Sequence, residues 1–235
     1  MLSSVAFVSL GPNCVPAELL RTGSLRTCTF GFDWLRSGFH HIYDFINMPL
    51  EDFIKVHVER PNIPLCQISN PNDNLTSTAE VEMFKPLCGY PYLYSPHRLY
   101  SDQTTQEYLK RCFKRLKYVL YNNKIYKVFI LADYTNKEYA NHLDSHDEII
   151  EALNTMMIPV VGLESFCISL IRIRLITNQI GLSELKVINL GSPRKVLLEI
   201  PDILDAENLR QHTYRSIARS VLKPLGQGLS LWQPI

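Results

Sequence analysis

The segment at residues 5–23 constrains the fold most, because a strand signal, a turn signal and a helix signal follow one another within it. Residues 5–10 form a short apolar run with β-branched members, which has the length of a buried strand. A Gly-Pro-Asn turn signal ends the run. The apolar spacing after Cys14 indicates a helix that ends at Gly23, acting as a C′ glycine. We therefore predict a strand, a tight turn and a helix with a thiol at its N-terminus.

The predicted place of Cys14 suits nucleophilic chemistry without requiring it. Backbone N–H groups and the helix dipole stabilise an anion at a helix N-terminus, either a thiolate or the oxyanion formed when it attacks a carbonyl. Pro16 fits the first turn, where its missing N–H costs little. Cysteine is also among the most often buried residue types and commonly packs as a small hydrophobe. Position alone leaves both a reactive and a buried Cys14 open.

Length and composition indicate one domain over residues 1–235, with an irregular loop at about 60–78. The apolar content of 46% supports a sizeable core, and the sequence shows no internal repeat or charged linker. A net charge of +1 gives no general attraction to nucleic acid. The longest apolar stretch is broken by Arg172 and Arg174, so we expect no membrane insertion. The oligomeric state is left open.

Cysteine usage indicates thiols in a reducing compartment. The six cysteines are scattered without a Cys-x-x-Cys pair, so neither a zinc site nor a disulfide framework is indicated, and no metal or cofactor is expected. The N-terminus lacks the basic region of a signal peptide. We expect the protein in the cytoplasm or, if it is an exported bacterial effector, secreted without a classical signal peptide.

Strand and helix patterns alternate along the rest of the chain. The sequence predicts an amphipathic helix over 103–120 and then a strand over 127–132 that ends at Asp133. Further strands are predicted at 158–161, 167–176, 186–190 and 196–200, and further helices at 137–156 and 206–222. We expect an α/β fold with three layers, in which helices flank a central, mostly parallel or mixed sheet; a papain-like α+β fold is the alternative. Cys14 and Asp133 would then face the same sheet edge.

Two other segments carry polar residues of interest. Asp33 stands between Phe32 and Trp34 in an aromatic segment that reads as a core-lining loop, and a carboxylate there needs a partner if it is buried. The adjacent His40 and His41 point about 100° apart on a helix, so we interpret them as surface or cap residues. The helix over 103–120 has a basic face that includes Arg115, which is either solvated or meets a phosphate or an acidic patch.

Several of these motifs together resemble a known family. The pattern S-L-G-x-N-C at residues 9–14, a Leu-Arg pair at 20–21 and F-D-W at 32–34 are similar to the N-terminal signature of a largely bacterial family of unknown function described as papain-like cysteine peptidases. Pro96-His97 after an aromatic run is similar to the histidine motif of that family. The resemblance covers roughly the first half of the chain.

The resemblance implies roles for specific residues. Cys14 would be the nucleophile, and His97 would act first as general base and then as general acid. No motif fixes the third member; we favour Asp133, with Asp102, Asp33 and Asn136 behind it. The Cys14 N–H and the Asn13 side chain would form the oxyanion hole, and Asp33, Trp34 and Arg115 would contribute to substrate binding.

The chain departs from the family pattern at two positions. Gly31 stands where the family usually has proline, which we expect to change only backbone stiffness. Arg98 follows His97 where an aspartate is common, so a carboxylate that would orient the imidazole is missing.

Three functions follow from these patterns. The favoured one is a cysteine-dependent hydrolase or acyltransferase that acts on an amide, isopeptide or ester carbonyl of a protein, peptide or other acyl substrate. The second is a transferase that holds a phosphorylated or sugar substrate through aspartates and the basic helix. The third is a non-catalytic interaction module in which Cys14 belongs to the core.

Overall fold

The computed structural model describes most of the N-terminal third, one long helix, the strands and the C-terminal helix, namely residues 2–11, 14–35, 37, 39–59, 103–134, 155, 168–176, 186–189, 195–201, 207–226 and 228–234. Its strands are β1 (Ser4–Ser9), β2 (Ile125–Tyr134), β3 (Ile168–Ile176), β4 (Lys186–Asn189), β5 (Lys195–Pro201) and β6 (Ser230–Leu231). Its helices are α1 (Val15–Thr22), α2 (Phe39–Asn47), α3 (Leu50–His57), α5 (Gln103–Tyr121), α7 (Glu207–Ile217) and α8 (Lys223–Leu225), with a π-helical turn, η3 (Ala218–Leu222), between the last two.

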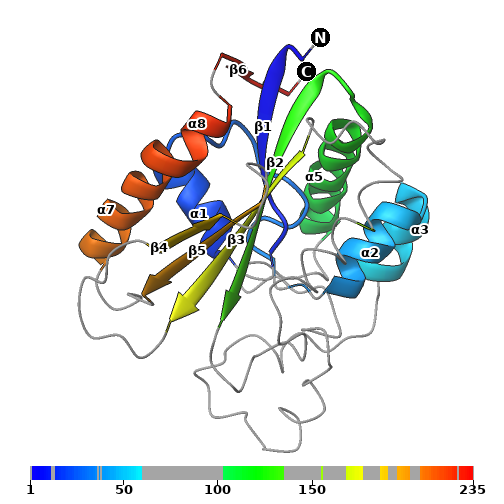
Figure 1. Cartoon of the computed structure of the whole chain (residues 1–235). Helices are drawn as coiled ribbons and strands as arrows, with labels where there is room; N and C mark the ends of the chain where they lie inside the picture. Colours follow the sequence, from blue (N-terminus) through cyan, green and yellow to red (C-terminus); the bar gives the residue numbers. More distant parts are fainter. Residues whose placement is uncertain are drawn as a thin grey trace, which may run out of the picture.

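The strands form one sheet in the order β4-β5-β3-β2-β1-β6. Strands β1, β2, β3 and β5 run parallel, β4 is antiparallel to β5, and the two residues of β6 pair in parallel with the start of β1. Figure 1 shows β1 and β2 in the middle of the molecule, with helices beside the sheet. The structure therefore contains a mainly parallel sheet with helices, which agrees with the mostly parallel or mixed sheet that the sequence predicts.

Alternate residues of β1 enter two different apolar clusters, as the two-residue period of a strand requires. Ala6 and Val8 pack with buried side chains of α2, α3 and α5. Val5 and Phe7 pack with buried side chains of α1, α7 and η3. Because β1 is buried along its length, it reads in the sequence as a continuous apolar run.

Four phenylalanines join the segment after α1 to α2, α3 and α5. The ring centroids lie 5.3 Å apart for Phe32 and Phe113, 5.6 Å for Phe32 and Phe45, and 4.9 Å for Phe53 and Phe113. Each such pair contributes about 0.5–1.5 kcal/mol beyond the area that it buries. The core-lining role predicted for the aromatic segment is confirmed for Phe32.

Gly31 does more than relax the backbone, so the expectation for this position was wrong. A Cβ atom at residue 31 would lie 2.1 Å from Cδ1 of Phe113. The phenylalanine cluster therefore requires a residue without a side chain here, because the ring of a fully buried Phe113 has no room to retreat.

The end of α1 also differs from the prediction in its detail. The helix ends at Gly23 as predicted, but Gly23 has a right-handed φ of −81°, and Ser24 has the left-handed φ of 56°. The Leu25 N–H donates to the Leu20 carbonyl and the Ser24 N–H donates to the Arg21 carbonyl, which is a Schellman motif with Ser24 at C′. Gly23 is needed for another reason, because a Cβ there would lie 2.2 Å from Cβ of Ala218.

The structure confirms several other predicted elements, corrects one residue assignment and does not describe the remaining elements. The strands at 167–176, 186–190 and 196–200 and the helices at 103–120 and 206–222 are confirmed with shifts of a few residues at their ends. His41 is fully buried, so its assignment to the surface was wrong. The predicted loop at 60–78, the strand at 158–161 and, apart from Thr155, the helix at 137–156 lie outside the described residues.

The C-terminal segment was not predicted, because two residues leave no periodic signal. The Trp232 N–H donates to the Val5 carbonyl at 2.8 Å, and the Thr27 hydroxyl donates to the Trp232 carbonyl at 2.7 Å. The Trp232 ring stacks on Phe30 with 5.9 Å between centroids. These contacts fix the last residues of the chain to its first strand.

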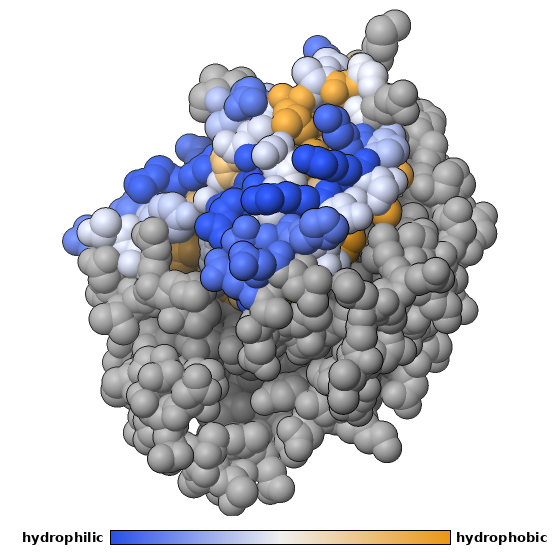
Figure 2. Space-filling view, turned by 90° about the vertical axis from the view of Figure 1, so that its left-hand side faces the viewer, coloured by the Kyte–Doolittle hydropathy of each residue, from blue (hydrophilic) through white to orange (hydrophobic). Residues whose placement is uncertain are grey.

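The outer face of α7 and of the turns that follow it is hydrophilic, as Figure 2 shows. Arg215, Arg219 and Lys223 are exposed on it. Within the described ranges, no helix is both long and apolar enough to cross a membrane.

Candidate functional site

Cys14 lies between the carboxyl end of β1 and the first residue of α1. Gly11 has a φ of 84°, a left-handed conformation that glycine adopts without steric cost. The Ala132 N–H donates to the Gly11 carbonyl at 2.9 Å, which ties the backbone just after β1 to β2. Cys14 then occupies the N-cap position of α1, and its carbonyl accepts the Glu18 N–H at 2.9 Å. The predicted thiol at a helix N-terminus is therefore present.

The Cys14 side chain is half-buried and makes no capping hydrogen bond to the helix. The first turn of α1 holds Pro16 and the acidic Glu18, whose carboxylate lies 3.4 Å from Nη2 of Arg210 on α7. Because the Cys14 sulfur does not cap the helix, the dipole of α1 acts on whatever charge develops at this end of the sheet.

The other two described thiols have different surroundings. Cys28 is half-buried and Cys112 is fully buried. Burial raises the pKa of both thiols, and the nearby Arg115 guanidinium offsets part of that increase. A raised pKa keeps a thiol protonated and therefore a poor nucleophile, so neither Cys28 nor Cys112 has the surroundings of a reactive cysteine.

The backbone of Asp133 lies near the carboxyl end of β2, the strand beside β1. Ala132, which precedes it, bonds to Gly11, so the chain leading to Cys14 and the chain at Asp133 leave the same sheet edge. The Asp133 side chain, Asn13 and His97 lie outside the described residues, as do the alternatives Asp102 and Asn136. The Cys14–His97–Asp133 arrangement stays a prediction.

Asp33 has the partner that its burial demands. Its Oδ2 lies 3.1 Å from Nε of Arg26 and accepts the Phe30 N–H at 3.1 Å. Burial raises the pKa of the Asp33 carboxyl to about 6, although the Arg26 guanidinium and the Phe30 N–H favour its charged form. Oδ1 is buried and has no hydrogen-bond partner among the described residues. Asp33 is thus a buried acid that titrates within the physiological range.

Trp34 shares Arg26 with Asp33. Its backbone has a left-handed φ of 61°, and the guanidinium carbons of Arg21 and Arg26 lie 5.6 Å and 5.3 Å from its ring centroid. Arg21 is on the last turn of α1, about 10 Å along the helix axis from Cys14. Asp33 and Trp34 therefore lie together beside the end of α1 that is farther from Cys14.

Arg115 is engaged within the protein. It donates to the Thr29 carbonyl at 3.0 Å and to the Arg111 carbonyl at 3.2 Å, and its Nη2 lies 3.7 Å from Sγ of Cys112. These contacts join α5 to the segment after α1. The substrate-binding role expected for Arg115 stays a prediction.

Sequence reasoning missed a cluster of two histidines and one aspartate, His41, His57 and Asp44, on α2 and α3. Nε2 of His57 lies 2.9 Å from Oδ2 of Asp44, and the His57 and His41 rings are 5.1 Å apart. The i to i+3 spacing of His41 and Asp44 on one helix was a usable signal, but the contribution of α3 was not. Of the part of the chain that the structure describes, no group of three or more Asp, Glu, His or Cys side chains is arranged to hold a metal ion.

A comparison with protein-family models identifies the family of this chain. The model of the family described as "Putative papain-like cysteine peptidase (DUF1796)" matches residues 5–173. The chain belongs to this family. The match begins in β1, includes Cys14 and reaches β3, so it extends well beyond the first half of the chain that the motifs covered. No curated protein and no solved structure matches the chain.

Proposed function

We propose that this member of the DUF1796 family is a cysteine-dependent hydrolase or acyltransferase, in which Cys14 attacks an amide, isopeptide or ester carbonyl of a protein, peptide or other acyl substrate. The observation that carries the proposal is the half-buried Cys14 thiol at the N-terminus of α1, the helix that follows β1 in the chain. The half-buried thiol also argues against the alternative in which Cys14 is a core residue, and the internal contacts of Arg115 give no support to a phosphate-binding transferase.

The proposed reaction proceeds through an acyl-enzyme. His97 takes the proton of the Cys14 thiol, and the thiolate attacks the carbonyl carbon. The negative charge that develops on the carbonyl oxygen is stabilised by the Cys14 N–H, the Asn13 side chain and the dipole of α1. The imidazolium returns its proton to the leaving group as the carbon–heteroatom bond breaks. Water or an acceptor amine then releases the acyl group, and Asp133 orients the imidazole.

We also propose a three-layer arrangement for the fold and a cellular location for the protein. The two apolar clusters on opposite sides of β1 support a three-layer domain, with α1 and α7 on one side and α2, α3 and α5 on the other. Such a domain in the cytoplasm, or exported without a classical signal peptide, would meet protein or peptide substrates.

Thiol reactivity tests the proposal. Limited iodoacetamide, followed by mass spectrometry of peptides, should label Cys14 at least about tenfold faster than Cys28 and Cys112. His97→Ala should slow Cys14 labelling near neutral pH, whereas His212→Ala, a change at an exposed histidine on α7, should leave the rate unchanged. A Cys14 no more reactive than the buried Cys112 would contradict the mechanism. A rate that is equal in the two histidine variants would remove His97 from it.

A further inference from the structure

A groove lies at the C-terminal end of α5, away from the Cys14 turn. It has a volume of about 520 Å³, and its lining comes from α3, the end of α5 and the turn that follows, namely Leu50, Lys114, Lys117, Tyr118, Tyr121, Asn122 and Asn123. The groove lies where the chain enters β2, whereas Cys14 follows the end of the parallel strand β1. The groove and Cys14 therefore lie near opposite ends of the parallel strands β1 and β2.

The groove gathers exposed aromatic surface. Tyr118 is 46% exposed and Tyr121 is 59% exposed. Of the large apolar or aromatic side chains that the structure describes, only Tyr43 is comparably exposed. Two aromatic rings that remain in water within one groove are characteristic of a recognition surface.

The two rings are held in place by the protein. The Tyr118 hydroxyl accepts a hydrogen bond from Nδ2 of Asn122 at 3.1 Å, and its ring lies 6.1 Å from the Trp232 ring. Nζ of Lys117 lies 5.4 Å from the Tyr121 ring centroid. Because ordered side chains lose little conformational entropy when a ligand binds, these rings are preorganised for contact.

Lys117 is not itself available to a ligand. Its ammonium group donates to the carbonyls of Phe45, Ile46 and Met48 at 2.5, 3.2 and 3.0 Å. Three hydrogen bonds use all three N–H groups of an ammonium ion. Lys117 therefore supports Tyr121 and joins α5 to the end of α2.

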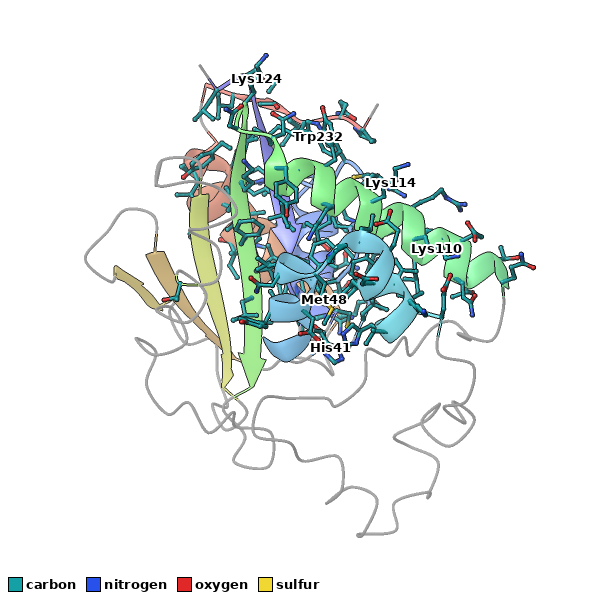
Figure 3. The ribbon with its side chains drawn as sticks, turned by 90° about the vertical axis from the view of Figure 1, so that its right-hand side faces the viewer. His41, Met48, Lys110, Lys114, Lys124 and Trp232 are labelled. Atoms are coloured by element: carbon teal, nitrogen blue, oxygen red, sulfur yellow. The ribbon has the colours of Figure 1, made fainter. Side chains whose placement is uncertain are left out.

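Lys114 lines the groove, and Arg111 and Lys124 precede and follow the lining residues of α5 and its turn along the chain. Arg111, Lys114 and Lys124 are exposed, and no ion pair joins any of them to another residue in the described ranges. By contrast, Lys110 lies 2.7 Å from Glu59 and 3.0 Å from Glu107. Figure 3 shows Lys110 and Lys114 along α5 and Lys124 beyond its end. The sequence from residue 108 to residue 124 contains no acidic residue, so the charged side chains that this stretch contributes to the surface are all positive.

We infer that the groove at the end of α5 is a docking site for an acidic, extended peptide segment of a protein partner. From Arg111 to Tyr121 the helix axis advances about 15 Å, which equals about five residues of extended peptide. The cations are spread along this line instead of converging on one point, so they fit carboxylates along a peptide better than a single phosphate group. The tyrosine faces would take the apolar side chains between the carboxylates.

Fluorescence anisotropy with a labelled peptide of about ten residues, alternating glutamate and proline, tests the inference directly, because proline keeps such a peptide extended. The native protein should bind it, and the affinity should fall several-fold when salt is raised, because exposed charges are screened. Lys114→Glu and Tyr121→Ala should each weaken binding by about tenfold or more, a loss of about 1.4 kcal/mol. Lys114→Arg and Tyr121→Phe should retain binding.

Two control variants test whether the peptide binds at this groove and independently of the Cys14 site. Arg219→Glu removes an exposed cation on η3 and should leave binding unchanged. Cys14→Ser should also bind normally, so failure of the proposed reaction and failure of the docking site are distinguishable. No binding by the native protein, equal binding of a glutamine–proline peptide, or equal binding by the Lys114 and Tyr121 variants would each overturn the inference.

Discussion

The buried carboxyl of Asp33 departs clearly from the chemistry of a free side chain. A carboxylate flanked by Phe32 and Trp34 was expected to need a partner, and Arg26 supplies one. The salt bridge does not offset the full cost of burial, because the pKa of Asp33 still rises from 3.8 to about 6. Sequence reasoning found the demand for a partner but could not identify Arg26, since seven positions separate the two residues along an irregular segment.

Asp33 should make stability depend on pH in a defined window. Its unfolded pKa is 3.8 and its folded pKa is about 6, so between these values the unfolded state has lost a proton that the folded state keeps. The free energy of unfolding should therefore fall as pH rises through this window, by roughly 3 kcal/mol from this group, and should not change further above it. Asp33→Asn should flatten this part of the profile in urea unfolding. The exposed Asp52→Asn should not, and an unchanged slope in the Asp33 variant would contradict the assignment.

Gly31 gives a second prediction at this scale. Gly31→Ala should lower the free energy of unfolding by about 1–3 kcal/mol, because the new methyl group would overlap the Phe113 ring. Gly228→Ala is the matched control. Residue 228 has a φ of 86°, but a Cβ there would meet no atom within 4 Å, so only the backbone cost of about 1 kcal/mol or a little more applies. Equal losses in the two variants would show that packing against Phe113 is not what excludes a side chain.

Among the elements, α5 has basic side chains that bind different parts of the protein. The sequence correctly predicts the helix and its cationic residues, because their spacing follows the helical period. It does not show that Lys117 caps the end of α2, that Arg115 contacts the segment after α1, or that Lys110 pairs with Glu59. Each of these partners lies more than fifty positions away along the chain, so no local pattern contains them.

Lys117 should contribute to stability although its burial lowers the pKa of its ammonium group. Lys117→Met keeps much of the side-chain volume but leaves three carbonyls at the end of α2 without their donor. The expected loss is about 1–3 kcal/mol in denaturant unfolding. Lys114→Met, one turn away and exposed, should change stability by no more than about 0.5 kcal/mol. A similar effect of the two substitutions would mean that water replaces the Lys117 hydrogen bonds at no cost.

On the scale of the whole molecule, the sequence predicts the described strands and helices well and the long-range contacts between them poorly. The strand before Cys14 and the helix after it were predictable because their signals are local. The edge strand β6 was not, because its pairing with β1 joins residues more than two hundred positions apart. The candidate site could be predicted only in part. Strand direction places Asp133 at the edge that leads to Cys14, whereas the pairing of Asp33 and Trp34 with Arg26 beside the far end of α1 depends on tertiary packing.

The contacts of Trp232 predict that the C-terminal segment is part of the folding unit. Its ring contacts Phe30 and Tyr118, its N–H bonds to β1, and it is only 8% exposed. Trp232→Ala should therefore lower the free energy of unfolding by about 3–5 kcal/mol, measured by circular dichroism because the substitution removes one of two tryptophan fluorophores. Trp232→Phe should recover much of the loss, and Tyr43→Ala at an exposed ring should cost little. A loss below about 1 kcal/mol in Trp232→Ala would show that β1 and the Phe30 segment are held without the C-terminus.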